Sequence, residues 1–190
     1  MNNLLLFDQS ITLFLKNLIP HNLFFNYFFS FFSLKGNSIF VWLLVILISV
    51  ILEERKNPWI SKRDKKFIIL FSLSFILTTL IVSYPLKNLF HRPRPTLDTK
   101  YSILNTNSCP KDFSFPSGHA ATAFAAAAIL VYFDKKRRWF YYAIAVLISF
   151  SRIYLSCHYF FDVVAGALIG YAISRLLLSF PDTFPFRRKS

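Results

Sequence analysis

The sequence predicts an all-α protein, a polytopic membrane helix bundle of five to six transmembrane helices. Of its 190 residues, 55% are hydrophobic and only 16% are charged, whereas a soluble domain carries about 25% charged residues. The apolar residues form long runs that are almost free of charge, which indicates that a bilayer is the solvent of these segments. The length allows one domain over residues 1–190.

Five runs predict membrane-spanning helices, because a crossing helix needs roughly 20 apolar residues, or fewer where flanking side chains reach the interface. The runs are Asn37–Leu52, Phe67–Leu86, Pro116–Phe133, Trp139–Cys157 and Tyr159–Phe180. Small residues predict where these helices pack closely. Alanines crowd the stretch Ala120–Ala128, and Gly166 and Gly170 form a small-xxx-small pair on another run.

The N-terminal 36 residues (1–36) leave two alternatives open. Leu4–Leu18 carries charges at Asp8 and Lys16, and a break at Pro20 separates it from the short apolar stretch Leu23–Leu34. The segment is either one kinked span or two helices that lie in the membrane interface. We take a sixth span as the expectation.

The net charge of +13 would indicate a nucleic-acid partner in a soluble protein. Here 13 of the 22 Lys and Arg residues lie in three clusters, Arg55–Lys66, Lys135–Arg138 and Arg187–Lys189. The clusters alternate with apolar runs as the positive-inside rule requires. We therefore expect no nucleic-acid partner. We expect a multi-pass plasma-membrane protein whose clusters, including the basic tail 181–190, face the cytoplasm.

This orientation places the loop 87–116 outside the cell and collects polar residues at the outer ends of three spans. These residues are Lys87, Arg94, Ser117, Gly118, His119, Arg152, His158 and Asp162. Ionisable residues beside membrane spans usually have a function. The topology therefore predicts a candidate site at the extracytoplasmic face.

The residue types in this group describe an anion site. Lys87 and Arg94 are seven residues apart and would share one face if their helix continued that far, and Arg152 adds a third positive charge. Ser117 is predicted to be a helix N-cap after Pro116. The backbone N–H groups of residues 117–119 would then point out of the helix end and form an anion cradle.

Two histidines complete the predicted chemistry. His158 and Asp162 are spaced i, i+4 and are expected to meet on one helix face. The carboxylate would accept the proton on one imidazole nitrogen and leave the other nitrogen as a nucleophile. His119 would protonate the leaving oxygen as general acid. No Asp/His cluster resembles a metal cage, so we expect no metal and no other cofactor.

These residues fall into three patterns, which are Lys87-x6-Arg94-Pro95, Pro116-Ser117-Gly118-His119 and Ser151-Arg152-x5-His158-x3-Asp162. In this order and spacing they resemble the signature of the type-2 phosphatidic acid phosphatase (PAP2) superfamily. Soluble vanadium haloperoxidases share the signature, but the apolar spans argue against that class. The resemblance implies a metal-independent helix bundle.

The resemblance also implies a role for each matched position. It assigns phosphate binding to Lys87, Arg94, Ser117, Gly118 and Arg152. It makes His119 the acid, His158 the residue that becomes phosphohistidine, and Asp162 the residue that orients it.

The activity implied is hydrolysis of a lipid phosphate or diphosphate, with a lipid phosphate and membrane lipids as partners. By analogy, undecaprenyl diphosphate is the first candidate substrate. Phosphatidylglycerophosphate, phosphatidate and lipid A phosphates are competitors, and the loop Thr96–Phe115 is expected to shape the choice. A lipid phosphotransferase and a non-catalytic lipid-binding or transport protein are alternatives of another class. The oligomeric state stays open.

The remaining polar residues receive simpler interpretations. The spacing of Cys109 and Cys157 fits no metal motif. We expect two ordinary thiols, although a disulfide is open because both fall on the outer side. His91 and Arg92 are expected to face lipid headgroups without a firm role, and His21 is expected in a loop or at the interface.

Overall fold

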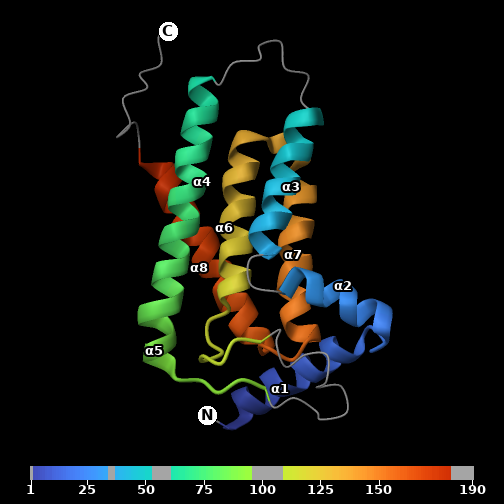
Figure 1. Ribbon diagram of the computed structural model, residues 1–190. Helices are drawn as coiled ribbons and strands as arrows, with labels where there is room; N and C mark the ends of the chain where they lie inside the picture. The colour runs from blue at the N-terminus through green and yellow to red at the C-terminus, as the bar shows by residue number, and fades with distance from the viewer. Residues whose placement is uncertain (1, 34–36, 53–60, 96–108, 181–190) are drawn as a thin grey trace.

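The computed structural model describes residues 2–33, 37–52, 61–95 and 109–180, and these residues fold into helices joined by turns (Figure 1). The elements are α1 (Asn2–Asn17), α2 (Leu23–Ser33), α3 (Asn37–Leu52), α4 (Lys62–Ile81), the π-helical η1 (Val82–Leu86), α5 (Lys87–Phe90), α6 (Gly118–Phe133), the 3-10 turn η3 (Lys135–Arg137), α7 (Arg138–Tyr154) and α8 (Phe160–Ser179). The long helices α3, α4, α6, α7 and α8 run along the bundle, and α1 lies across its lower end in the view of Figure 1.

Helix α6 is the centre of the bundle and packs against α4, α7 and α8. A Cβ atom on Gly166 would lie 2.3 Å from the Ser117 carbonyl oxygen, and one on Gly170 would lie 1.9 Å from the Ala121 carbonyl oxygen. The backbones of α6 and α8 therefore touch, and only glycine fits at these two positions. The close packing predicted from small residues is confirmed.

Helix α4 continues through η1 into α5, so that Lys62–Phe90 forms one long helical segment. The widened turn η1 contains Pro85, whose missing N–H and bulky ring disturb regular α-helical bonding. The segment ends at His91, which has the left-handed φ of 46°. The helix thus ends before Arg94, so the condition under which Lys87 and Arg94 would share a helix face is not met. Arg92 and Arg94 each precede a proline, which disfavours the helical conformation.

All five predicted runs coincide with helices, although α7 ends at Tyr154 rather than Cys157. Within the part of the chain that the structure describes, two helical segments, Lys62–Phe90 and Phe160–Ser179, are long and apolar enough to cross a bilayer, and Leu23–Ser33 and Gly118–Phe133 are shorter apolar helices. The number of crossings, five or six, stays a prediction.

The N-terminal segment forms two separate helices, α1 and α2, rather than one continuous helix. Helix α1 contacts α7 and α8 at the end of the bundle (Figure 1). Most of its apolar side chains face outward, while Asp8 and Thr12 are buried against the protein. The outward residues are Leu4, Leu5, Leu6, Phe7, Leu13 and Phe14. Polar residues thus face the protein and apolar residues face outward, as expected for a helix that lies in a membrane interface. The placement of α1 in the membrane stays a prediction.

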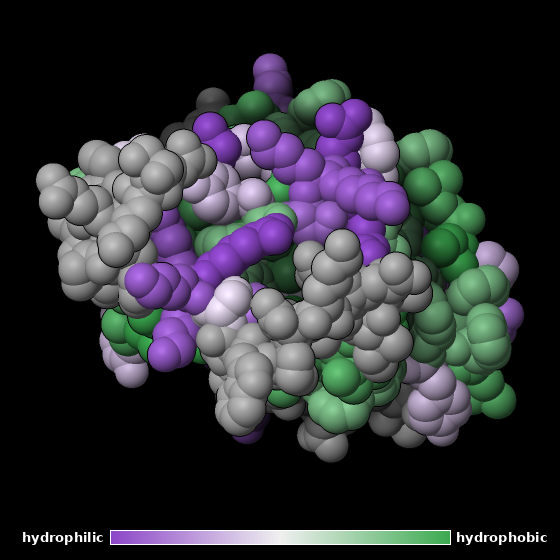
Figure 2. Space-filling model, turned by 90° about the horizontal axis from the view of Figure 1, so that it is seen from above, coloured by the Kyte–Doolittle hydropathy of each residue, from purple (hydrophilic) through white to green (hydrophobic). Residues whose placement is uncertain are grey.

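The opposite end of the bundle is basic. Lys62–Lys66 begins α4 there, Lys135–Arg138 lies beside it, and the Arg63 guanidinium donates to the Phe133 carbonyl. Figure 2 views this end and shows hydrophilic side chains gathered over the helix ends, with hydrophobic residues on the flanks. The rest of the first cluster (residues 55–60) and the tail 181–190, with Arg187–Lys189, lie outside the described residues.

Candidate active site

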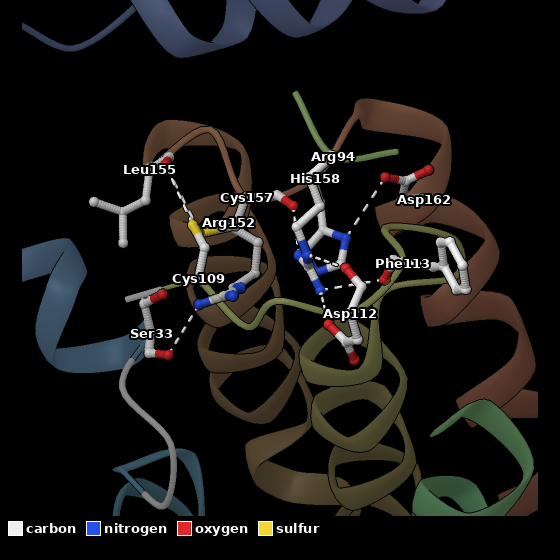
Figure 3. The surroundings of a disulfide bond; sticks show 10 residues. All are labelled: Ser33, Arg94, Cys109, Asp112, Phe113, Arg152, Leu155, Cys157, His158 and Asp162. Atoms are coloured by element: carbon white, nitrogen blue, oxygen red, sulfur yellow. Dashed lines mark hydrogen bonds and ion pairs between the residues drawn. A yellow bond between two sulfur atoms is a disulfide. The ribbon is translucent and has the colours of Figure 1, made fainter. Parts of the chain in front are cut away.

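The three signature patterns lie at the end of the bundle that carries α5 and the α7–α8 turn (Figure 1), and Figure 3 shows residues of the first and third patterns there. Arg94 connects two of them, because its Nη1 atom donates to the Cys157 carbonyl at 2.6 Å and lies 3.1 Å from His158 Nε2. Arg94 and Arg152 are both electrostatic neighbours of Lys87. Arg152, Lys87 and Arg94 also act electrostatically on His119. Residues from positions 87 to 158 therefore surround one small volume.

His158 lies in the turn between α7 and α8 and is only 1% exposed. The turn forms because Ser156 adopts a left-handed φ of 56°, after which the His158 amide donates to the Arg152 carbonyl at 3.2 Å. His158 thus precedes α8, whose N-cap is Tyr159. The predicted shared helix face is wrong, yet the turn still brings His158 Nδ1 to 3.5 Å from Asp162 Oδ2.

The neighbours of His158 decide which of its nitrogens carries the proton. A guanidinium has only donors, so His158 Nε2 must accept from Arg94 and the ring proton lies on Nδ1, which faces Asp162. Burial, together with the charges of Arg152, Arg94 and Lys87, holds the pKa of His158 well below its ordinary value. The ring is therefore neutral at pH 7 and directs the Nε2 lone pair toward the cations.

Arg92 holds the other side of Asp162. Its Nη1 atom donates to Asp162 Oδ1 at 2.6 Å, and its Nη2 atom donates to Asp8 Oδ2, also at 2.6 Å. The guanidinium also stacks 4.0 Å above the Tyr159 ring. The expectation that Arg92 faces headgroups is wrong, because this cation is taken up by two carboxylates within the protein. His91, by contrast, is exposed and ends α5.

Asp112 is a site residue that the sequence interpretation missed. Its carboxylate forms ion pairs with both Lys87, at 2.6 Å, and Arg94. Burial raises the pKa of Asp112, but hydrogen bonds from Lys87 and Arg94 outweigh it, and the pKa lies below its ordinary value. Asp112 therefore stays ionised and supplies an anion to the two cations. No fixed spacing pointed to it, because its contacts are 18 and 25 residues away.

Arg152 reaches the site from α7 and is completely buried. Its Nη1 atom donates to the carbonyl of Ser33, the last residue of α2, at 2.9 Å (Figure 3). A helix C-terminus carries partial negative charge and favours a cation. The N-terminal helix α2 thus holds a residue predicted to bind phosphate.

Ser117 and Gly118 begin α6 as predicted, and the N-cap is confirmed because Ser117 Oγ accepts from the Ala120 amide at 3.4 Å. The Ser117 amide donates to the Asp162 carbonyl at 2.9 Å, so the prediction that it forms part of an anion cradle is wrong. A Cβ atom on Gly118 would meet only Val82 Cγ1, at 3.8 Å. The protein therefore has room for a Cβ atom at Gly118, in ordinary van der Waals contact with Val82.

Cys109 and Cys157 form a disulfide with their Cα atoms 5.4 Å apart, so the expectation of two free thiols is wrong. The segment from 109 to 115 folds back onto the α7–α8 turn, which brings the two cysteines together (Figure 3). The bond ties the segment that carries Asp112 to the turn that carries His158. The loop Thr96–Phe115, expected to select the headgroup, is described only from Cys109 onward.

Comparison with known proteins places this geometry in a family. Residues 65–185 match the model of the PAP2 superfamily. An undecaprenyl-diphosphatase of Sulfolobus acidocaldarius is 33% identical over 133 residues, which are 68% of this chain and 62% of that protein. A lipid A 4'-phosphatase of Bacteroides thetaiotaomicron is 30% identical over 172 residues, which are 86% of this chain and 72% of that protein. The match to the first relative thus spans less than two thirds of its length.

A solved structure shares the fold. It is a transmembrane PAP2-type phosphatidylglycerolphosphate phosphatase from Bacillus subtilis, with a TM-score of 0.62 and 24% sequence identity. The alignment covers 98% of this chain and 90% of that protein. The family match covers well over half of the chain, and the fold is that of a transmembrane bundle. This chain is a membrane protein that belongs to the PAP2 superfamily.

Proposed function

We propose that the chain is a lipid phosphatase that hydrolyses a phosphate monoester or diphosphate through a phosphohistidine on His158. One observation carries the proposal. His158 Nε2 is unprotonated and lies 3.1 Å from Arg94 Nη1, among positive charges, while Nδ1 faces Asp162 at 3.5 Å. A buried, oriented imidazole beside a cation cluster is suited to attack on a phosphoryl group.

The first step forms a bond between His158 Nε2 and phosphorus and breaks the bond from phosphorus to the leaving oxygen. Lys87, Arg94 and Arg152 bind the phosphoryl oxygens, and Ser117 and Gly118 border the same volume. His119 gives its proton to the leaving oxygen, which departs as a lipid alcohol or a lipid monophosphate. Asp162 stabilises the positive charge that develops on the His158 ring.

The second step consumes water. A water molecule attacks phosphorus, His119 takes its proton, and the bond from phosphorus to nitrogen breaks. Inorganic phosphate leaves, and both histidines return to their starting protonation states. Asp112 must release Lys87 and Arg94 before phosphate binds them, because the ion pairs use the same donors.

The proposal assigns charge stabilisation to side chains and requires no metal ion. Three cations, Lys87, Arg94 and Arg152, supply the charge. Across residues 2–33, 37–52, 61–95 and 109–180, no three His, Cys, Asp or Glu side chains gather in a way that could hold a metal ion. Activity in excess EDTA tests this part of the proposal directly.

Undecaprenyl diphosphate is the first substrate proposed, supported by the name of the Sulfolobus acidocaldarius relative. Lipid A phosphate and phosphatidylglycerophosphate are supported by the names of the other two proteins, and phosphatidate remains an alternative. Exposed apolar side chains beside the site, Tyr84, Leu89 and Phe90, would lie against the lipid chain.

We further propose that the chain crosses the plasma membrane several times and that the site faces the extracytoplasmic side. The basic clusters at the opposite end of the bundle support this orientation. The Cys109–Cys157 disulfide supports it independently, because such bonds persist in oxidising compartments.

Phosphate release from purified protein in detergent tests the proposal, with each of the four lipids offered in excess EDTA. We expect release from at least one lipid, and loss of release in His158→Ala. His91→Asn is the matched control, because His91 is exposed and asparagine tolerates its left-handed φ. No release from any of the lipids would contradict the proposal and favour a lipid-binding or transport protein. Transfer of phosphate to an added alcohol in preference to water would indicate a phosphotransferase.

A further inference from the structure

Helix α1 contributes a buried carboxylate next to the site, outside the three signature patterns. Asp8 is 1% exposed, although its neighbour Phe7 is 57% exposed. Asp8 Oδ2 accepts from Arg92 Nη2 at 2.6 Å, and Oδ1 accepts from the Phe161 amide at 2.9 Å. A charged group this deeply buried is tolerated only with such partners. Both carboxylate oxygens of Asp8 therefore accept hydrogen bonds from groups next to Asp162, one from the Arg92 side chain and one from the Phe161 amide.

Arg92 joins Asp8 to Asp162 through two different nitrogen atoms, each 2.6 Å from its carboxylate. The series continues from Asp162 Oδ2 to His158 Nδ1 at 3.5 Å. Asp8 thus fixes the guanidinium that holds Asp162 Oδ1, and Oδ2 is left facing the imidazole. The Tyr159 amide donates to the same Oδ2 atom at 2.9 Å. The orientation of Asp162 depends on both of these supports.

The same face of α1 also caps α8. The Phe160 amide donates to Thr12 Oγ1 at 2.9 Å, and the next amide, that of Phe161, donates to Asp8 Oδ1. A helix N-terminus has unsatisfied amides and favours negative charge. Asp8 and Thr12 share the capping role, but among the described contacts of these two residues only Asp8 reaches Arg92.

We propose that Asp8 is a positioning residue for the reaction, acting through Arg92 on the Asp162–His158 pair. This inference rests on the proposed function. Without the Asp8 charge, Arg92 would be held by Asp162 alone and would draw that carboxylate away from His158 Nδ1. The chemical step would slow. Phosphate binding would change little, because Arg94 and Arg152 keep their own anchors at the Cys157 and Ser33 carbonyls.

The test compares Asp8→Asn with Thr12→Val in the purified full chain. For Asp8→Asn we expect kcat to fall about tenfold and KM to change less than about threefold, as for loss of a charge-assisted contact that acts on the chemical step. Thr12→Val removes a cap on the same helix face and should keep kcat within about twofold of wild type. Asp8→Glu should recover part of the lost kcat.

A double-mutant cycle isolates the route through Arg92. If Asp8 acts through Arg92, adding Asp8→Asn to Arg92→Gln should lower kcat by less than about twofold further. Fully multiplicative effects would contradict the route. Equal kcat values for Asp8→Asn and Thr12→Val, or a change confined to thermal stability, would overturn the inference.

The variant Arg92→Lys keeps the inference testable if Asp8→Asn does not fold. Arg92→Lys retains the positive charge but cannot reach two carboxylates with two nitrogens, and it should lower kcat with KM preserved; an unchanged kcat would overturn the inference. The proposed function is judged separately, by wild-type turnover and by its loss in His158→Ala. If both hold while Asp8→Asn matches wild type, only the positioning role of Asp8 is lost.

Discussion

The stretch from Lys87 to Asp162 and the N-terminal helices α1 and α2 both build the site, but the sequence encodes them differently. In the first region, the residues proposed to touch phosphate stand at fixed short spacings. In the second, Asp8 and the Ser33 carbonyl hold Arg92 and Arg152 across separations of 84 and 119 residues. The residues that react or bind phosphate must keep a fixed geometry relative to one another, and this geometry is reflected in their sequence spacing. The residues that hold them can lie anywhere in the sequence, provided that the fold brings them into contact.

This difference gives an order of expected effects. Substitutions in the signature region should alter the chemical step strongly, and substitutions in its supports should alter it moderately or through stability. If substitution of a supporting residue lowered kcat as much as substitution of a reacting residue, the distinction between the two regions would be wrong.

Among substitutions that keep the proposed nucleophile His158, the largest effect is expected for Asp162→Asn. An amide can no longer favour the Nδ1–H tautomer of His158, so kcat should fall by about a thousandfold, as in other oriented-histidine sites. Rapid-quench kinetics would measure the loss, with the thermal midpoint as a check on folding. An unchanged kcat would remove Asp162 from the mechanism.

The next prediction compares two glycines, one proposed to leave room for phosphate and one required for helix packing. Gly118→Ala adds a methyl group where the protein leaves room, with Val82 Cγ1 at 3.8 Å, so the fold should survive. Phosphate binding should weaken, with kcat/KM lower by about tenfold or more, because the methyl group enters the space proposed for an oxygen. Gly166→Ala instead places a Cβ atom 2.3 Å from the Ser117 carbonyl and should destabilise the bundle. Equal activity and stability in both variants would contradict this division.

The sequence predicted the helices and the signature residues because both depend on local patterns. It placed His158 close to Asp162 for a wrong reason, since a turn rather than a helix face joins them. Arg92 and Asp112 could not be assigned, because their ion pairs join segments whose distance apart depends on the whole fold. The disulfide could not be predicted for the same reason, because the spacing of two cysteines 48 residues apart does not indicate whether they pair.

A smaller effect, of opposite sign, is expected for Asp112→Asn. The Asp112 carboxylate pairs with Lys87 and Arg94 and competes with any phosphate for them. Removing its charge should tighten inhibition by inorganic phosphate by about three- to tenfold, since an ionised competitor is lost. Inhibition constants at pH 7 would show the change. Weaker inhibition in the variant would mean that Asp112 helps to bind phosphate.

The pH response of His158 should be nearly flat near neutrality. Burial and the charges of Arg152, Arg94 and Lys87 lower its pKa, although Asp162 faces Nδ1. The ring therefore stays neutral as the pH falls through 6.5, and it protonates only well below that value. An unperturbed histidine would lose about two thirds of its neutral form between pH 7 and pH 6.

Histidine NMR of the substrate-free protein, assigned with His158→Asn, would detect the titration. A His158 signal that titrates at pH 6.5 or above would contradict the neutral ring. The same lowered pKa predicts that this group destabilises the fold as pH falls below 6.5, because the unfolded chain then binds a proton that the folded chain excludes.

The most direct measurement is the position of the covalent phosphate. Wild-type protein would be mixed with a lipid diphosphate labelled in its terminal phosphate, quenched within milliseconds under alkaline conditions and mapped by peptide sequencing. The label should lie on His158, should be acid-labile and should be missing from His158→Ala. A label on another residue would contradict the proposed nucleophile.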